Sequence, residues 1–173
     1  MHIGVFGHIG RALMPKRLER TISGMLTKKG KYGLKALVHL SRLPPERLAF
    51  VNDVAVANHI PKKFLDAILG ELRNAGFVQS RKGKDGGYRL ARPAAEIKIG
   101  HVIRVLDGPL APLSCASQTR YQRCEDCDET TCEVRHMMLE VRQAIASVLD
   151  NRSLAAMRDA DNDDLPIELI ARL

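Results

Sequence analysis

The sequence predicts a mainly α-helical fold with one small β-hairpin, followed by a long separate helix. Apolar residues recur at helical spacing over 26–43, 51–60 and 61–76. Over 77–93 the period changes from helical to alternating around a glycine-rich turn, which is typical of a β-hairpin. Three helices followed by a basic hairpin indicate a winged helix-turn-helix over residues 25–108.

The first predicted helix has an apolar face that consists of Tyr32, Leu34, Leu37, Val38 and Leu40. Thr27 can cap its start, because a threonine hydroxyl accepts a hydrogen bond from a free backbone N–H at a helix N-terminus. Pro44 and Pro45 end the helix, since proline cannot continue it.

Two short helices follow, and Asn52 is the expected cap of the first of them. Pro61 stands at the first position of the second, where the missing N–H has no partner to lose. Gly76 supplies the left-handed residue that ends this helix. Its buried stripe is predicted to consist of Phe64, Leu65, Ile68, Leu69 and Leu72.

The hairpin is expected where residues 77–78 and 88–90 flank the turn KGKDGG. Residues 97–108 then indicate a short extended piece and a helical turn that ends at Gly108. Residues 1–24 have no clear period, so we expect a flexible N-terminal extension, with Met25 as a candidate second start.

Residues 133–150 predict a long helix with an apolar seam at heptad spacing. The seam consists of Val134, Met138, Val141, Ile145 and Val148. A helix that projects beyond a small domain would expose this surface, so we favour a homodimerisation helix, with packing on its own domain as the alternative. Residues 151–173 form a C-terminal tail that is acidic and then apolar.

Charge is divided unevenly along the chain. The net charge is +7, with +9 on residues 25–108 and −5 on residues 109–173. A basic first part suggests a region that meets a polyanion such as DNA. Because no apolar run approaches the roughly 18–20 residues that span a bilayer, and the N-terminal charges have the wrong order for a signal peptide, we expect a cytoplasmic protein without membrane contact.

The candidate DNA-reading residues lie on the third helix and on the hairpin. In a helix-turn-helix the second helix of the motif enters the major groove by its N-terminal end. Here that end carries Lys62, Lys63 and Asp66, which can donate to guanine or phosphate and accept from a cytosine amino group. At the hairpin tip the candidates for a minor groove are Arg81, Lys82 and Lys84.

All four cysteines lie in the stretch CASQTRYQRCEDCDETTC, within a loop over residues 109–132. They are Cys115, Cys124, Cys127 and Cys132, with the spacing C-x8-C-x2-C-x4-C. Clustered thiols in the cytoplasm indicate metal or redox chemistry rather than structural disulfides. Nearby acidic side chains disfavour thiolates unless a cation compensates, so a bound metal is favoured over activated free thiols.

Spacing alone leaves three kinds of site open. Structural zinc usually takes two C-x2–4-C pairs, and only CEDC fits. An iron–sulfur cluster tolerates irregular spacing better, and a thiol switch needs no metal. A thiol–disulfide oxidoreductase that uses Cys124 and Cys127 is a further alternative, although its usual βαβ context is missing. No other enzyme is indicated.

The assembled pattern resembles the IscR/NsrR/RirA family of bacterial winged-helix repressors. The matching stretches, over residues 25–158, are LTKKGKYGLKAL, LRNAGFVQSRKGKDGGYRLA, IKIGHVIRVLDG and VLDNRSLAAM. The resemblance implies a homodimer with crossed long helices that binds double-stranded DNA at a palindromic promoter site. It also implies an iron–sulfur cluster, 2Fe–2S or 4Fe–4S, that reports on iron, oxygen, nitric oxide or redox state.

The resemblance also assigns DNA-binding residues. The start of the family's recognition helix is matched by Lys62, Lys63, Asp66 and Ala67. Lys82 lies where the family often has a minor-groove arginine. Thr27 and Lys28, at the start of the first helix, complete the predicted DNA-binding set.

For the cluster, the resemblance implies three cysteine ligands, with Cys115 first, Cys132 third, and either Cys124 or Cys127 between them. Some family members take a ligand from a histidine, and that position is Arg135 here, with His136 next. Others take a ligand from an aspartate, and that position is Lys31 here. The extra cysteine can fill the gap, which predicts an all-cysteine site. We therefore expect a cluster-controlled transcription regulator, with a zinc- or thiol-switched repressor as the alternative.

Overall fold

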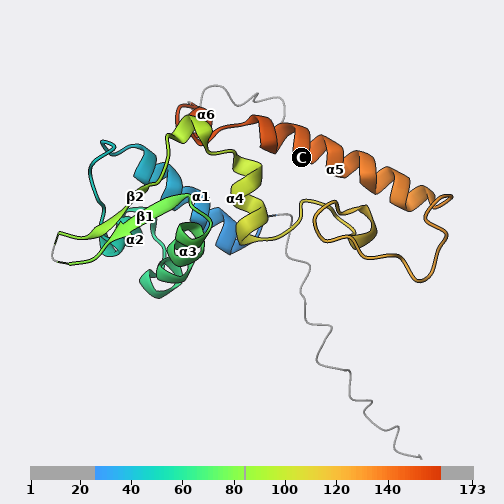
Figure 1. Cartoon of the computed structure of the whole chain (residues 1–173), viewed down its shortest axis with the longest axis horizontal. Coiled ribbons are helices and arrows are strands. Elements are labelled where there is room, and N and C mark those ends of the chain that lie inside the picture. The colour runs from blue at the N-terminus through green and yellow to red at the C-terminus, as the bar shows by residue number, and fades with distance from the viewer. Residues whose placement is uncertain (1–25, 84, 161–173) are drawn as a thin grey trace, which may run out of the picture.

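The computed structural model describes residues 26–83 and 85–160. Figure 1 shows a packed body of helices and a hairpin, from which one long helix projects. The helical elements are α1 (Lys28–Ser41), α2 (Val51–Asn58), α3 (Lys62–Asn74), η1 (Ala94–Glu96), α4 (Ile99–Leu106), η2 (Ser114–Ala116), α5 (Glu133–Asn151) and α6 (Leu154–Arg158). The strands are β1 (Val78–Arg81) and β2 (Gly87–Leu90). The predicted fold class is confirmed; the predicted N-terminal extension and most of the predicted tail lie outside the described residues.

The hairpin pairs Val78 with Leu90 and Arg81 with Gly87 in antiparallel register. Ala49, in the loop before α2, extends it, because the Ala49 N–H donates to the Tyr88 carbonyl at 2.9 Å and the Tyr88 N–H donates back at 2.8 Å. Gly87 lies beside this bridge with a φ of 148°, and a Cβ there would overlap the Ala49 backbone. A glycine is therefore required where the two backbones approach.

The core lies between α1, α2, α3, the hairpin and α4. Its largest fully buried side chains are Leu37, Val54, Leu65, Ile68, Leu69, Leu72, Val78, Ile97, Val102 and Leu154. Each such side chain stabilises the fold by about 1.5–3 kcal/mol when it leaves water. Leu154 belongs to α6, so the chain returns to the body after the long helix and packs on α1. Among the described helices, none is long and apolar enough to cross a membrane.

Several predicted helix ends can be compared with the structure. Thr27 caps α1, since its Oγ1 accepts from the backbone N–H groups of the second and third following residues at 3.1 and 3.3 Å. Gly76 follows α3 with a φ of 76°, as predicted. The Asn52 cap is wrong, because α2 begins one residue earlier and the side chain of Phe50, at the cap position, cannot accept a hydrogen bond. Pro61 stands at the cap position of α3 rather than in its first turn.

Asp107, at the end of α4, holds the start of α1 from the opposite side. Its Oδ2 accepts from the Thr27 N–H at 2.9 Å, and its Oδ1 accepts from the Thr27 hydroxyl at 2.5 Å and the Gly30 N–H at 3.1 Å. A Cβ at Gly30 would overlap this carboxylate. A negative charge at a helix N-terminus is favourable, so Asp107 acts as a second cap supplied by a distant helix.

An ion pair joins α5 to α4. The Arg104 guanidinium donates to both carboxylate oxygens of Asp150, at 2.6 and 2.8 Å. Gly100 makes room for it, because a Cβ there would overlap the Asp150 carboxylate. The chain directly after α5 is held by backbone hydrogen bonds: the Ile99 N–H donates to the Arg152 carbonyl at 3.0 Å, and the Leu154 N–H donates to the Ile97 carbonyl at 2.8 Å. The C-terminal end of α5 is thus fixed to the body.

This ion pair predicts a pH-dependent stability. The Arg104 guanidinium lowers the pKa of Asp150, so the pair stabilises the fold above the unfolded carboxyl pKa and loses its effect as pH falls through the folded pKa. Both side chains are partly exposed, so Arg104→Gln should lower the free energy of unfolding by about 1 kcal/mol at pH 7. In urea denaturation the gap to the unmodified chain should begin to narrow below about pH 4 and close as pH falls through the lowered folded pKa. Arg152→Gln, an exposed control, should show no gap. A gap for Arg104→Gln that did not narrow at all on acidification would contradict this prediction.

Candidate DNA-reading surface and thiol site

The residues of α3 that are predicted to contact DNA share one exposed face of the helix. Leu65, Ile68, Leu69 and Leu72 point into the core, and the opposite face exposes Lys62, Lys63, Asp66 and Ala67. Lys62 and Asp66 form an ion pair of 3.5 Å along the helix. The turn that precedes α3 passes through His59 in the left-handed conformation, with a φ of 54°. The short helix α2 and α3 are thus joined as a helix-turn-helix requires.

Two apolar side chains of α2 and α3 are also exposed. Phe64 was predicted to belong mainly to the buried stripe, but it is 42% exposed and packs edge-on against Tyr32, with ring centroids 5.8 Å apart. The stripe prediction is wrong at this position, because Phe64 lies at the edge of the apolar stripe, whereas Leu65 in the same turn is fully buried. Val56 of α2 is 67% exposed on its own helix and was not predicted as a functional residue. Both side chains are available for apolar contact with a thymine methyl group.

The other DNA-binding candidates differ in their environments. Arg81 and Lys82, at the hairpin tip, and Lys28, at the start of α1, are exposed. Lys84 lies outside the described residues. The Thr27 hydroxyl is engaged with α1 and Asp107, so a DNA contact from Thr27 remains a prediction.

The cysteine loop lies alongside the N-terminal part of α5 (Figure 1). The ligand atoms of Cys124, Asp126 and Cys127 all lie within 4.8 Å of one another. Cys132 caps α5 through its sulfur, which accepts from the Arg135 N–H at 3.4 Å. Cys115 is buried in η2, with 6% of its surface exposed, and η2 packs on α5.

The thiols affect one another. The neighbouring thiols of Cys124 and Cys132 raise the pKa of Cys127 to about 12. The carboxylate of Asp126, 2.8 Å from the Cys124 sulfur, raises the pKa of Cys124. These groups therefore stay protonated unless a cation replaces their protons. Soft sulfur donors that lose their protons only when a cation replaces them suit a metal ion or an iron–sulfur cluster.

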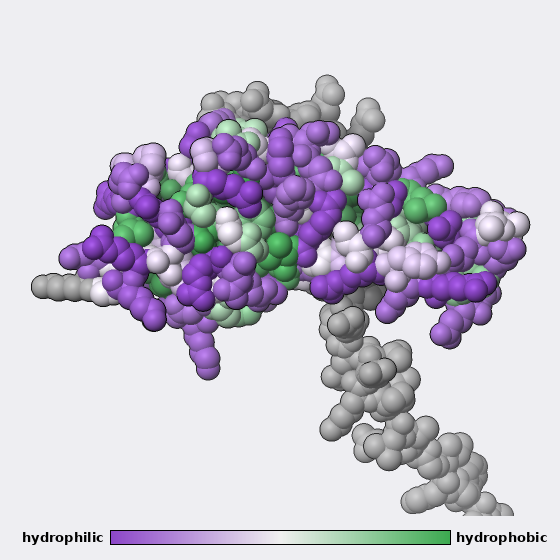
Figure 2. All heavy atoms as spheres, in the orientation of Figure 1, coloured by the Kyte–Doolittle hydropathy of each residue, from purple (hydrophilic) through white to green (hydrophobic). Residues whose placement is uncertain are grey.

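The long helix carries an apolar stripe that the body does not cover. Ile145 packs against the core, whereas Val134 and Val148 are 55% and 62% exposed. Met137 and Val141 are exposed on the same side of the helix. The predicted seam is thus divided between the chain's own core and an exposed face. Figure 2 shows hydrophobic residues scattered among hydrophilic ones in the region of α5.

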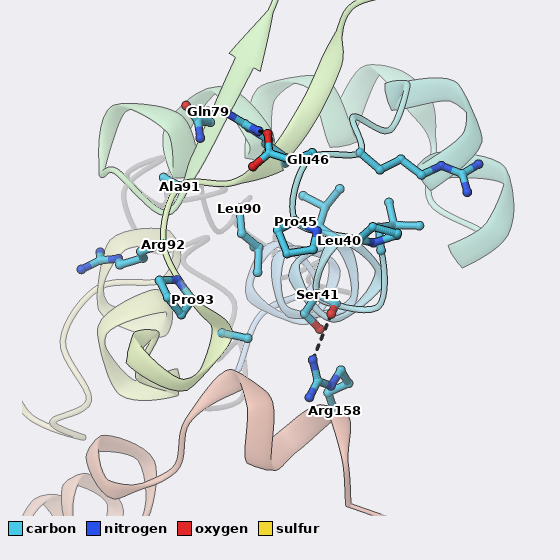
Figure 3. A pocket seen from close by; sticks show the side chains of 15 residues that line it. Leu40, Ser41, Pro45, Glu46, Gln79, Leu90, Ala91, Arg92, Pro93 and Arg158 are labelled. Carbon is cyan, nitrogen blue, oxygen red and sulfur yellow. Dashed lines mark hydrogen bonds and ion pairs between the residues drawn. The ribbon is translucent and has the colours of Figure 1, made fainter.

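A separate cavity of about 430 Å³ lies between the end of α1, the hairpin root and α6 (Figure 3). Its walls include the apolar side chains of Leu40, Leu43, Pro45 and Leu90. Two arginines in its wall are already engaged: Arg89 pairs with Glu46, while Arg158 pairs with Asp159 at 2.6 Å and donates to the Ser41 carbonyl at 3.0 Å. The hydrogen bond from Arg158 to Ser41 thus joins α6 to the end of α1 at this cavity.

Comparison with known proteins gives a consistent result. The Rrf2 family, described as an iron-dependent transcriptional regulator, matches residues 26–160. An rrf2-like HTH-type transcriptional regulator of Rhodobacter capsulatus is 40% identical over 143 residues, 80% of this chain and 95% of that protein. CymR, the global cysteine regulator of B. subtilis, is similar in structure with a TM-score of 0.65 at 30% identity, covering 79% of this chain and 98% of CymR. IscR of T. potens has a TM-score of 0.62 at 30% identity, covering 81% and 90%.

The fold and these relatives define a winged-helix transcription regulator. The chain belongs to the Rrf2 family. The family resemblance expected from the sequence is confirmed, and members of the family bind DNA as dimers. Because the family and the relatives are regulators and not enzymes, the oxidoreductase alternative does not stand.

Proposed function

We propose that this chain is a cytoplasmic, homodimeric repressor whose promoter binding is controlled by an iron–sulfur cluster that senses iron, redox state or nitric oxide. One observation carries the proposal: three thiols gather directly before α5, the helix with an uncovered apolar stripe. Cys124, Cys127 and Cys132 would hold the cluster, with Cys115 as the fourth predicted ligand. A two-fold symmetric dimer would read a palindromic site.

The chain's own residues would couple the site to DNA. When bound, a cluster supplies a redox-sensitive bond network among the thiols. Cys132 is the cap of α5, so a change at its sulfur acts directly on the start of that helix. The far end of α5 is fixed to α4 by Arg104 and Asp150. A shift of α5 would therefore change the spacing of the two α3 helices, with a coupling of about 1–3 kcal/mol.

Anaerobic purification followed by iron and sulfide counts and an absorption spectrum tests the cluster. We expect a brown protein with bound iron and sulfide, and we expect Cys127→Ser to lose both, because its thiol lies between two others. Thr131→Ser, an exposed neighbour, should retain them. DNA affinity that is identical with and without the cluster would remove this mechanism.

A zinc site is the second candidate, because the Asp126 carboxylate lies among the ligand atoms. Zinc accepts mixed sulfur and oxygen donors, and iron–sulfur clusters usually take thiolates. The same preparation separates the two candidates. A colourless protein with one zinc per chain would favour a zinc-switched repressor with the same DNA contacts.

If α5 forms the dimer contact, a charge placed on its exposed apolar stripe should separate the two subunits. Val141→Glu would place a carboxylate in an apolar contact, at a cost of several kcal/mol if unpaired. We expect the variant to be monomeric in sedimentation experiments and to bind DNA more weakly. Gln143→Glu adds the same charge at an exposed position on the opposite side of α5 and should remain dimeric. Equal masses for both variants would argue against α5 as the dimer contact.

A further inference from the structure

Arg135, in the first turn of α5, contacts three separate parts of the cysteine loop. Its backbone N–H donates to the Cys132 sulfur at 3.4 Å. Its Nε donates to the Cys115 carbonyl at 3.1 Å, and its Nη1 donates to the Glu129 carbonyl at 3.3 Å. One residue of the helix therefore holds the start of the thiol-bearing segment and two points near its end.

Glu129 extends these contacts to the remaining part of the loop. Its Oε1 accepts from the Cys124 N–H at 3.0 Å, and its Oε2 accepts from the Tyr121 hydroxyl at 2.5 Å. Through Glu129, Arg135 is thus connected to the segment that carries Cys124 and Cys127. Cys115, Cys124 and Cys132 are thus each hydrogen-bonded to Arg135 or Glu129, although neither residue supplies a sulfur ligand.

The contacts require a guanidinium. Arginine presents five N–H donors in a rigid planar fork, so it can satisfy two carbonyl groups from different segments at once. A lysine ammonium at the same position keeps the charge, but it is a point donor on a flexible stem and cannot fix both carbonyls in one geometry. The two side chains therefore separate the effect of charge from the effect of geometry.

We propose that Arg135 is a clasp that keeps Cys115 buried against α5 and sets the arrangement of the thiols before any metal binds. In this role Arg135 is a positioning residue, and it links the order of residues 115–132 to the first turn of α5. The part of the inference that concerns metal retention rests on the proposed function, whereas the part that concerns Cys115 does not.

Alkylation of the metal-free full chain by N-ethylmaleimide, followed for each cysteine by mass spectrometry, tests the clasp. In the unmodified chain Cys115 should react slowly, because it is buried, and its own rate is the one compared between variants. Arg135→Ala should raise the Cys115 rate at least about tenfold by opening its segment locally. Arg123→Ala removes the same charge from an exposed loop position and should leave the rate unchanged. Circular dichroism should show that both variants keep their helices.

Arg135→Lys decides between geometry and charge. If the clasp acts through its two carbonyl contacts, Cys115 in this variant should react about as fast as in Arg135→Ala. Restoration of the slow rate by lysine would overturn the clasp, and so would a slow rate in Arg135→Ala.

Metal retention is a second, separate measurement. In protein reconstituted with iron and sulfide, a chelator should remove iron from Arg135→Ala at least about tenfold faster than from the unmodified chain, because local opening exposes the ligands. Faster alkylation with unchanged iron release would overturn the link to the metal site. If the chain holds no iron at all, the alkylation result still decides on the clasp, so failure of the proposed function and failure of the clasp are distinguishable.

Discussion

The double variant Lys62→Glu/Lys63→Glu is expected to lower DNA affinity at least about 100-fold at fixed salt. Both lysines are exposed at the N-terminal end of α3, the end that enters the major groove in a helix-turn-helix. The substitution removes two cations that can donate to guanine or phosphate and places two anions beside the duplex. Fluorescence anisotropy on a duplex selected from a random library by the unmodified chain measures the loss.

The matched control is Arg42→Glu/Arg152→Glu, which changes the net charge equally at exposed positions at the ends of α1 and α5. This control should retain most of the affinity. The α3 variant should also show a shallower salt dependence, by about two in the logarithmic slope, if both lysines contact phosphate. Equal losses in the two double variants would show that net charge matters and that α3 is not the reading helix.

Asp107→Ala is expected to destabilise the fold by about 2–3 kcal/mol, since it removes a charged acceptor from three hydrogen bonds. The N–H of Thr27 would lose its partner, and the hydrogen bonds that join Asp107 to the start of α1 would be lost. The transition midpoint in thermal unfolding should fall by about 5–10 °C in a chain of this size. Asp107→Asn keeps one acceptor oxygen and should lose less.

Asp85→Ala, an exposed position in the hairpin turn, is the control and should unfold at the same temperature as the unmodified chain. An unchanged midpoint for Asp107→Ala would mean that water replaces the three hydrogen bonds without net cost. In that case the join between α1 and α4 would depend on apolar contacts such as that of Leu106 with Gly33.

Patterns among neighbouring residues predicted the helices and the hairpin well. The apolar stripe of α1, the Thr27 cap and the Gly76 end depend on residues within one or two turns of each other, so the local sequence contains them. The two errors concern the start of α2 and the edge of the buried stripe of α3. The Asn52 cap failed because α2 begins at Val51, with Phe50 at the cap position. Phe64 is exposed because it lies at the edge of the apolar stripe of α3.

The candidate thiol site was predicted in part. Cysteine spacing identified the loop and all four thiols, because they lie within one short stretch. It did not indicate that Asp126 would join Cys124 and Cys127, or that Cys115 would be buried against α5. Arg135 was noted only as a departure from a family ligand, since its contacts with two carbonyls depend on how the loop folds back.

The sequence by itself determined the class of this protein: a basic helix-turn-helix with a hairpin, a thiol-rich loop and a long helix, each encoded by periodicity, turn residues or spacing. Only the tertiary structure decided which side chains meet across the chain. Asp107 reaches Thr27 over 80 residues, and Asp150 reaches Arg104 over 46. The physical reason is that helical and strand periods act between near neighbours, whereas these contacts arise only once apolar burial has packed distant helices together.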